Sequence, residues 1–115
     1  MEKIQADKVQ QAINAFNNKE VYIHLETTNG AYANFFNEKM FSAGAFIRNV
    51  KLTYSHGKIT GEGPFRVGLK LNGGWVYAEG LTHWEVDEKD RLLLAGHSGD
   101  GKLAAALEIS ETPFD

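Results

Sequence analysis

The 115-residue sequence predicts a mainly β protein: an antiparallel barrel or distorted sandwich of about nine or ten strands with one short N-terminal helix. Three observations predict this class. A single segment has helical periodicity, most of the remaining chain alternates polar and apolar residues, and twelve glycines against two prolines indicate many tight turns. The length suits a single β domain spanning residues 1–115, and 43% hydrophobic with 23% charged residues is a globular balance.

The helical segment spans residues 7–17. Asp7 can cap its first turn, and Gln10, three residues later, can complete a capping box. About ten residues of helix are marginal in isolation, so we expect the apolar side to pack on the sheet. That side repeats at i, i+3, i+4 and i+7 and consists of Val9, Ala12, Ile13 and Phe16.

Strand-like segments separated by turn residues fill the chain after Asn17. Asn29-Gly30 and Asn72-Gly73-Gly74 are hairpin signals, and His56-Gly57 is a further predicted turn. The last segment has helical propensity, but its alternation favours a strand. The predicted strands are Val21–Thr27, Tyr32–Phe36, Ala43–Arg48, Val50–Tyr54, Lys58–Glu62, Phe65–Leu71, Trp75–Glu79, Leu81–Val86, Arg91–Ala95 and Leu103–Ile109.

The hairpin around Asn72-Gly73 can be read in register. A two-residue turn gives it one apolar face, and a second face whose predicted pairs are Lys70 with Trp75, Gly68 with Tyr77, and Arg66 with Glu79. In one interpretation of the second face, an aromatic ring covers a glycine beside an exposed ion pair. In the other, the aromatic rings and the charged pair line a pocket for a small polar ligand.

A metal site is the second chemical hypothesis that the sequence raises. His24 and Glu26 share one face of a strand, and His97 follows an apolar strand, so the three could bind one divalent ion if the fold brings them together. A strand histidine is more often a half-buried, hydrogen-bonded side chain than a ligand. His56 and His83 are predicted to be solvated, and no other cofactor is predicted.

The segment from Gly96 to Lys102 matches the spacing G-x-x-x-x-G-K of a phosphate-binding loop. Leu103 stands where that motif requires Ser or Thr to hold magnesium, and no parallel α/β pattern surrounds it. We therefore interpret the segment as a turn between two strands. Asp87 and Asp90 are placed in a second, solvated turn.

Composition excludes several function classes. There is no cysteine, which rules out disulfides, thiolate zinc sites and cysteine nucleophiles. A net charge of −3 argues against a sequence-independent nucleic-acid binder. The N-terminus lacks the apolar core of a signal peptide and no run of apolar residues is long enough to span a membrane, so a cytoplasmic, soluble protein is expected.

Several stretches together resemble the YojF-like family, small proteins of low-GC Gram-positive bacteria without an assigned activity. The resemblance covers nearly the whole chain in order, and His24, Glu26, Arg48 and His97 fall inside matching stretches, whereas His56 and His83 do not. The stretches are Val-Tyr-Ile-His-Leu-Glu-Thr-Thr (21–28), Ile-Arg-Asn (47–49), Gly-Pro-Phe-Arg-Val-Gly-Leu-Lys (63–70), Trp-Val-Tyr-Ala-Glu-Gly-Leu-Thr (75–82), Leu-Leu-Ala-Gly-His (93–97) and Gly-Lys-Leu-Ala (101–104).

The resemblance implies a compact β protein. It also implies a link to an LmbE-like deacetylase of low-molecular-weight thiol (bacillithiol) synthesis, since some members are encoded beside one. The first functional hypothesis is thus a non-catalytic accessory or a small-ligand- or protein-binding domain. A metal-binding protein or metal-dependent enzyme using His24, Glu26 and His97 is the second, and a structural homodimer is the third. The candidate binding surface of the first hypothesis consists of Arg48, Arg66, Trp75, Tyr77 and Glu79.

Overall fold

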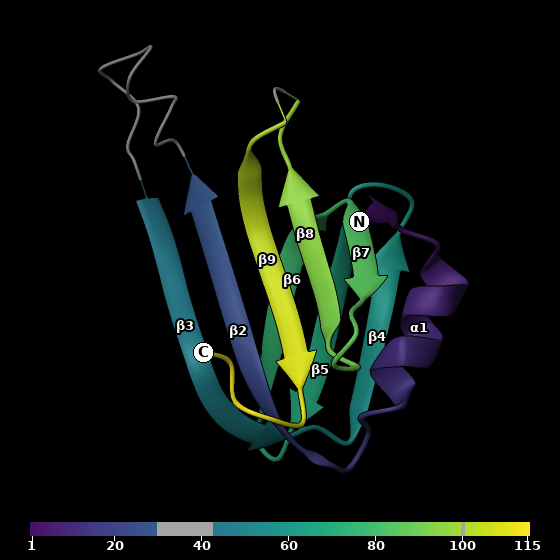
Figure 1. Ribbon diagram of the computed structural model, residues 1–115, viewed down its shortest axis with the longest axis vertical. Coiled ribbons are helices and arrows are strands. Elements are labelled where there is room, and N and C mark those ends of the chain that lie inside the picture. The colour runs from purple at the N-terminus through teal and green to yellow at the C-terminus, as the bar shows by residue number, and fades with distance from the viewer. Residues whose placement is uncertain (30–42, 100) are drawn as a thin grey trace.

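The computed structural model describes residues 1–29, 43–99 and 101–115, and this part of the chain forms nine strands and one helix (Figure 1). None of its helices has the length and apolar character needed to cross a membrane. The predicted strand Tyr32–Phe36 lies outside the described residues. In chain order the elements are β1 (Glu2–Lys3), α1 (Ala6–Asn14), β2 (Glu20–Asn29), β3 (Ala43–Thr53), β4 (His56–Gly61), β5 (Phe65–Leu71), β6 (Gly74–Leu81), β7 (His83–Val86), β8 (Leu92–His97) and β9 (Leu103–Ser110).

The strands form two antiparallel sheets. The first contains six strands in the order β1-β7-β8-β9-β2-β3, and the second contains three in the order β4-β5-β6. In Figure 1 the six-stranded sheet faces the viewer, the three-stranded sheet lies behind it, and α1 lies beside β4. The sheets do not close on each other, so the distorted sandwich is confirmed and the barrel is not. β3 and β6 are therefore edge strands within the described part of the chain.

The hydrophobic core lies between the inner faces of the two sheets and under α1. Leu94 and Leu107 are fully buried on the six-stranded sheet, as are Val67 and Leu69 on the three-stranded sheet. Each such side chain contributes roughly 1.5–3 kcal/mol relative to an exposed one. The alternation that predicted the strands thus marks the faces that meet in the core.

Helix α1 packs through the predicted apolar stripe, but its N-terminus differs from the prediction. The N-cap residue is Gln5, without a side-chain cap hydrogen bond, and Asp7 lies in the first turn, where a carboxylate favours the helix dipole. Gln10 does not complete a capping box. Its Nε2 donates to the carbonyl of Gly57 at 2.8 Å and its Oε1 accepts from the N–H of Ile59 at 3.0 Å. The side chain therefore joins the helix to β4.

Tyr54 fixes the other end of α1. Its hydroxyl is buried and donates to the carbonyl of Ile13 at 2.6 Å, and the same carbonyl also accepts the N–H of Phe16 at 3.2 Å. Burial raises the pKa of this hydroxyl. We expect Tyr54→Phe to lower the free energy of unfolding by about 0.5–1.5 kcal/mol, because one buried hydrogen bond is lost while the Ile13 carbonyl keeps the N–H of Phe16. Urea unfolding measures the loss, and an unchanged midpoint would contradict this role of the hydroxyl.

The β5–β6 hairpin has the predicted register on both faces near the turn. Leu71 pairs with Gly74, Leu69 with Val76 and Gly68 with Tyr77. Farther from the turn the register shifts, since Val67 pairs with Ala78 but Phe65 with Leu81. The additional residue on β6 makes a bulge in which Gly80 adopts a φ of 79°.

The two strands predicted on either side of Asn49 form a single strand, β3. Asn49 adopts a φ of 58°, and β2 shifts its register against β3 between Ile23 and Leu25. A β-bulge accommodates Asn49, so the strand continues through the residue that separated the two predicted strands. The C-terminal end of β2 pairs with the beginning of β3, where Thr28 lies opposite Gly44.

The structure also tests two other sequence predictions, the turn at His56-Gly57 and the strand at the end of the chain. His56-Gly57 is not a turn, because β4 already begins at His56, which pairs with Lys70. The segment Leu103–Ser110 is a strand, as its alternation predicted, and pairs with both β2 and β8. In both cases the pairing with neighbouring strands outweighs local propensity.

Candidate functional site

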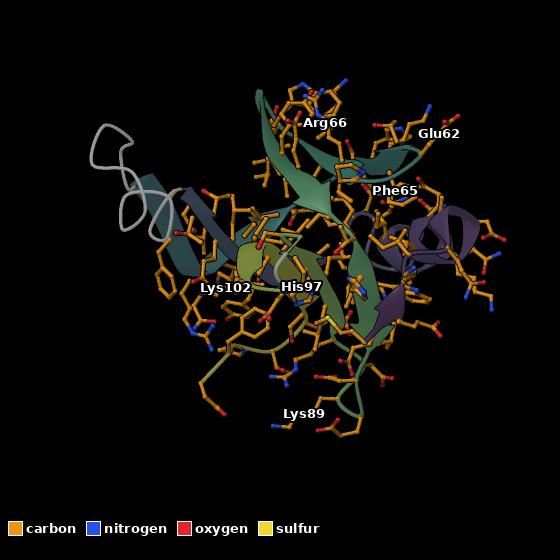
Figure 2. The ribbon with its side chains drawn as sticks, turned by 90° about the horizontal axis from the view of Figure 1, so that it is seen from above. Glu62, Phe65, Arg66, Lys89, His97 and Lys102 are labelled. Carbon is orange, nitrogen blue, oxygen red and sulfur yellow. The ribbon has the colours of Figure 1, made fainter. Side chains whose placement is uncertain are left out.

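Four of the five predicted binding residues meet on the outer face of β5 and β6. The rings of Trp75 and Tyr77 stack with centroids 5.4 Å apart and an interplanar angle of 7°. The Arg66 guanidinium lies 4.0 Å from the centre of the Tyr77 ring, and its Nε is 3.2 Å from a Glu79 carboxylate oxygen. The rings of this aromatic ridge remain about half exposed, 49% for Trp75 and 45% for Tyr77. In Figure 2 Arg66 lies on the outer side of the three-stranded sheet.

An apolar groove adjoins the aromatic ridge and runs between the two edge strands β3 and β6. Its volume is about 250 Å³. Two of its aliphatic side chains, Ile47 and Val50, are 40% and 45% exposed, which is unusual for residues of this type. We name it the β3–β6 groove, lined by Ile23, Leu25, Ile47, Val50, Leu52, Trp75, Val76 and Tyr77.

Arg48 does not join this surface. Its Nη1 donates to Nδ1 of His24 at 3.1 Å, and its Nε and Nη2 donate to the backbone oxygen of Asp115 at 3.0 and 2.8 Å. Its guanidinium carbon also lies 5.3 Å from the centre of the Phe114 ring. Arg48 therefore holds the C-terminal segment against β2 and β3, which is a structural task.

His24 is 5% exposed and has a defined set of partners. Arginine has no acceptor, so Nδ1 of His24 must accept from Arg48, and the ring hydrogen is then assigned to Nε2. Nε2 lies 3.3 Å from Oε2 of Glu26 and donates to it. In this arrangement the imidazole is neutral, and the contact with Glu26 is a hydrogen bond between a neutral group and a carboxylate.

The third residue of the predicted metal site, His97, lies elsewhere. Its Nδ1 is 3.3 Å from Nδ1 of His83, and the two ring centroids are 4.9 Å apart. In the ranges that the structure describes, no three His, Asp or Glu side chains are grouped as metal ligands. The structure thus separates His97 from His24 and Glu26.

A cleft of about 700 Å³ is lined by His83 and His97. Glu62 and Pro64, between β4 and β5, and Phe65, the first residue of β5, also line it. In Figure 2 Phe65 and Glu62 lie above and to the right of His97. β1 contributes Lys3. A volume of this size is within the range of small-molecule sites.

His83 is the residue that the sequence interpretation missed, because it was predicted to be solvated. The pairing of β7 with β8 would have indicated that His83 lies near His97, and the sequence interpretation did not use it. His83 pairs with Ala95, so His97 is its diagonal neighbour two residues along β8. His56, by contrast, is exposed as predicted.

Asp87 was also predicted to be solvated, and that prediction is wrong. Its Oδ1 accepts the backbone N–H groups of Lys89 and Arg91 at 2.9 and 3.0 Å, and its Oδ2 accepts Nε of Arg91 at 2.7 Å. Burial alone would raise the pKa of the Asp87 carboxyl, but these hydrogen bonds outweigh burial and hold the pKa below its usual value. The carboxylate therefore organises the β7–β8 turn.

The segment resembling a phosphate-binding loop is a turn between antiparallel strands, as predicted. The N–H of Ser98 donates to the carbonyl of Lys102 at 2.8 Å, and the N–H of Gly101 donates to that of Ser98 at 2.8 Å. β8 ends at His97 and β9 begins at Leu103, with the two strands paired.

These features define a small antiparallel β-sandwich with an apolar surface groove and a histidine-lined cleft. The chain belongs to the family DUF1806, proteins of unknown function, whose model matches residues 3–114. It is 54% identical over 114 residues to the uncharacterized protein YojF of Bacillus subtilis (strain 168), covering 99% of this chain and 98% of that protein. The crystal structure of Bacillus subtilis YojF matches with a TM-score of 0.83 and 50% identity, covering 99% of this chain and 96% of that one. The resemblance seen in the sequence is confirmed.

Proposed function

We propose that this chain is a non-catalytic accessory protein that binds another protein through the β3–β6 groove. The observation that carries this proposal is the exposed apolar lining of the groove between two edge strands. A volume of about 250 Å³ is below the usual size of a small-molecule site and suits an anchoring side chain of a protein partner. Aromatic residues and arginine are the residue types that dominate binding energy at protein interfaces.

The surroundings of the groove support a protein interface. Trp75 and Tyr77 form one wall, and the Arg66–Glu79 pair continues the same face as a polar border. Apolar centres with polar borders are typical of protein–protein interfaces. Within the described ranges β3 and β6 are edge strands, and edge strands offer backbone groups to an additional strand.

The partner that we propose is an LmbE-like deacetylase of low-molecular-weight thiol (bacillithiol) synthesis. The support is the resemblance to the YojF-like family, some members of which are encoded beside such an enzyme. An accessory protein needs no catalytic residues of its own, and its effect would appear in the activity or stability of the deacetylase.

Two matched substitutions test this proposal. Val50 lies in the groove and is 45% exposed, whereas Val86, on the distant strand β7, is 48% exposed. We expect Val50→Asp to weaken binding to the purified deacetylase at least tenfold, because a carboxylate would be desolvated in an apolar interface. Val86→Asp should bind as the unchanged chain does. Biolayer interferometry measures both affinities.

Two outcomes contradict the proposal. If the unchanged chain neither binds the deacetylase nor alters its activity, the proposed partner is wrong. If Val50→Asp and Val86→Asp weaken binding equally, the groove is not the interface. Sedimentation of the chain alone addresses the homodimer hypothesis: a dimer that only Val50→Asp dissociates would assign the groove to a second copy.

A further inference from the structure

A second hollow, of about 210 Å³, adjoins the aromatic ridge on the outer face of the three-stranded sheet. Trp75 and Tyr77 line this hollow as well as the β3–β6 groove, so the ridge borders both. The groove extends from the ridge to β2 and β3, whereas this hollow extends to β4 and β5. We name it the basic hollow, lined, besides the ridge, by His56, Lys58, Thr60, Arg66 and Gly68.

The charge of this outer face is opposite in sign to that of the whole chain. The strand register puts Lys58 and Lys70 on the same face of the sheet as Arg66. One carboxylate, that of Glu79, accompanies these three cations on the described strands of this sheet, whereas the chain has a net charge of −3. Glu79 is paired with Arg66, and within the described residues Lys58 forms no ion pair. The face is therefore complementary to an acidic ligand.

The aromatic ridge holds two of these cations in place. The Arg66 guanidinium lies 4.0 Å from the centre of the Tyr77 ring, and Lys70 Nζ lies 6.0 Å from the centre of the Trp75 ring. The two rings also stack on each other. Single-stranded nucleic acid needs exposed ring faces on which its bases can stack, and here the ring faces contact one another and the cations. Carboxylates, which bind the cations directly, suit this arrangement better than nucleobases do.

We propose that the partner segment bound in the β3–β6 groove is acidic. An apolar side chain of the segment fills the groove, and carboxylates of the same segment bind Lys58, Arg66 and Lys70 at the basic hollow. This inference rests on the proposed function and adds the chemistry of the partner. β6 and β4 are separated by one strand, hence by roughly 10 Å, and an extended segment covers that distance in about three residues. The acidic residues are therefore expected about three or four positions from the apolar one.

Selection of phage-displayed random peptides on the immobilised chain tests this inference without requiring the deacetylase. We expect the selected peptides to combine a large apolar residue with Asp or Glu about three or four positions away. Lys58→Glu should reduce the enrichment of Asp and Glu at least fivefold and keep that of the apolar residue. Lys89→Glu is the matched control, because Lys89 is also exposed and lies at the opposite end of the view from Arg66 (Figure 2). It changes the net charge equally and should keep both preferences.

The outcomes separate this inference from the proposed function. Selected peptides without an acidic preference, or an acidic preference that persists in Lys58→Glu, would overturn the inference and leave the groove in place. An apolar preference that persists in Val50→Asp would instead contradict the groove, and no enrichment by the unchanged chain would contradict both. Oligothymidylate that binds more tightly than every selected peptide, and is lost in Lys58→Glu, would assign the face to single-stranded nucleic acid and overturn the inference.

Discussion

Gly96→Ala should lower the free energy of unfolding by more than about 4 kcal/mol or prevent folding, because the two sheets touch at this residue through their backbones. A Cβ atom on Gly96 would overlap the carbonyl oxygen of Gly80 and lie 2.9 Å from its carbonyl carbon. Backbone atoms cannot rotate away as a flexible side chain can. β8 is held between β7 and β9, and Gly80 is held in the bulge of β6 with a φ of 79°.

Gly99→Ala is the matched control for this prediction. Gly99 lies three residues further along the chain, and a Cβ atom there would have no other atom within 4 Å. We expect its free energy of unfolding, measured by urea titration, to change by less than about 0.5 kcal/mol, as for other surface substitutions. Near-native stability of Gly96→Ala would mean that the sheets can separate at this point at low cost.

Two local features of this fold could be predicted from the sequence. Asn72-Gly73 fixes the register of β5 against β6, and the pairing of Gly68 with Tyr77 follows from it. The apolar stripe of α1 required only the period of a helix. Each of these features depends on residues close together in the chain, so no knowledge of the sheet order was needed.

Features that depend on sheet order could not be predicted in the same way. The contact of Gly96 with Gly80 requires knowing that β8 and β6 face each other from different sheets. The hypothesis of a metal site at His24, Glu26 and His97 left open whether His97 meets His24, and in the structure β9 lies between β8 and β2. His24 lies opposite Glu108, and Glu108 lies opposite Leu93, four residues before His97.

In the candidate site too, contacts within one hairpin could be predicted, whereas contacts that depend on sheet order could not. The Arg66–Glu79 pair beside Tyr77 was predicted, because all three residues belong to one hairpin. Arg48 was assigned to the same surface on residue type alone, and the structure places it with His24 and the C-terminal segment instead. The β3–β6 groove was not predicted, since it exists only because a three-stranded sheet covers part of a six-stranded one.

The largest effect expected outside the core is that of Asn49→Ala, which should lower the free energy of unfolding by about 2–4 kcal/mol. Asn49 Nδ2 donates to the carbonyl of Phe114 at 2.8 Å, and Oδ1 accepts the N–H of Phe114 at 2.7 Å. Alanine removes both hydrogen bonds and tolerates a φ of 58° less well than asparagine does. Thermal or urea unfolding measures the change.

Two further variants separate these causes. Asn49→Gly removes the hydrogen bonds but accepts the positive φ, so it should be more stable than Asn49→Ala by about 1 kcal/mol. Asn49→Asp keeps the acceptor for the N–H of Phe114 and loses the donor, so the amide of Phe114 should stay better protected from hydrogen exchange than in Asn49→Gly. Equal stability of the alanine and glycine variants would mean that the bulge does not require its left-handed backbone. Loss of protection in Asn49→Gly would show that this one side chain holds Phe114 over His24, which lies 6.3 Å away between ring centroids.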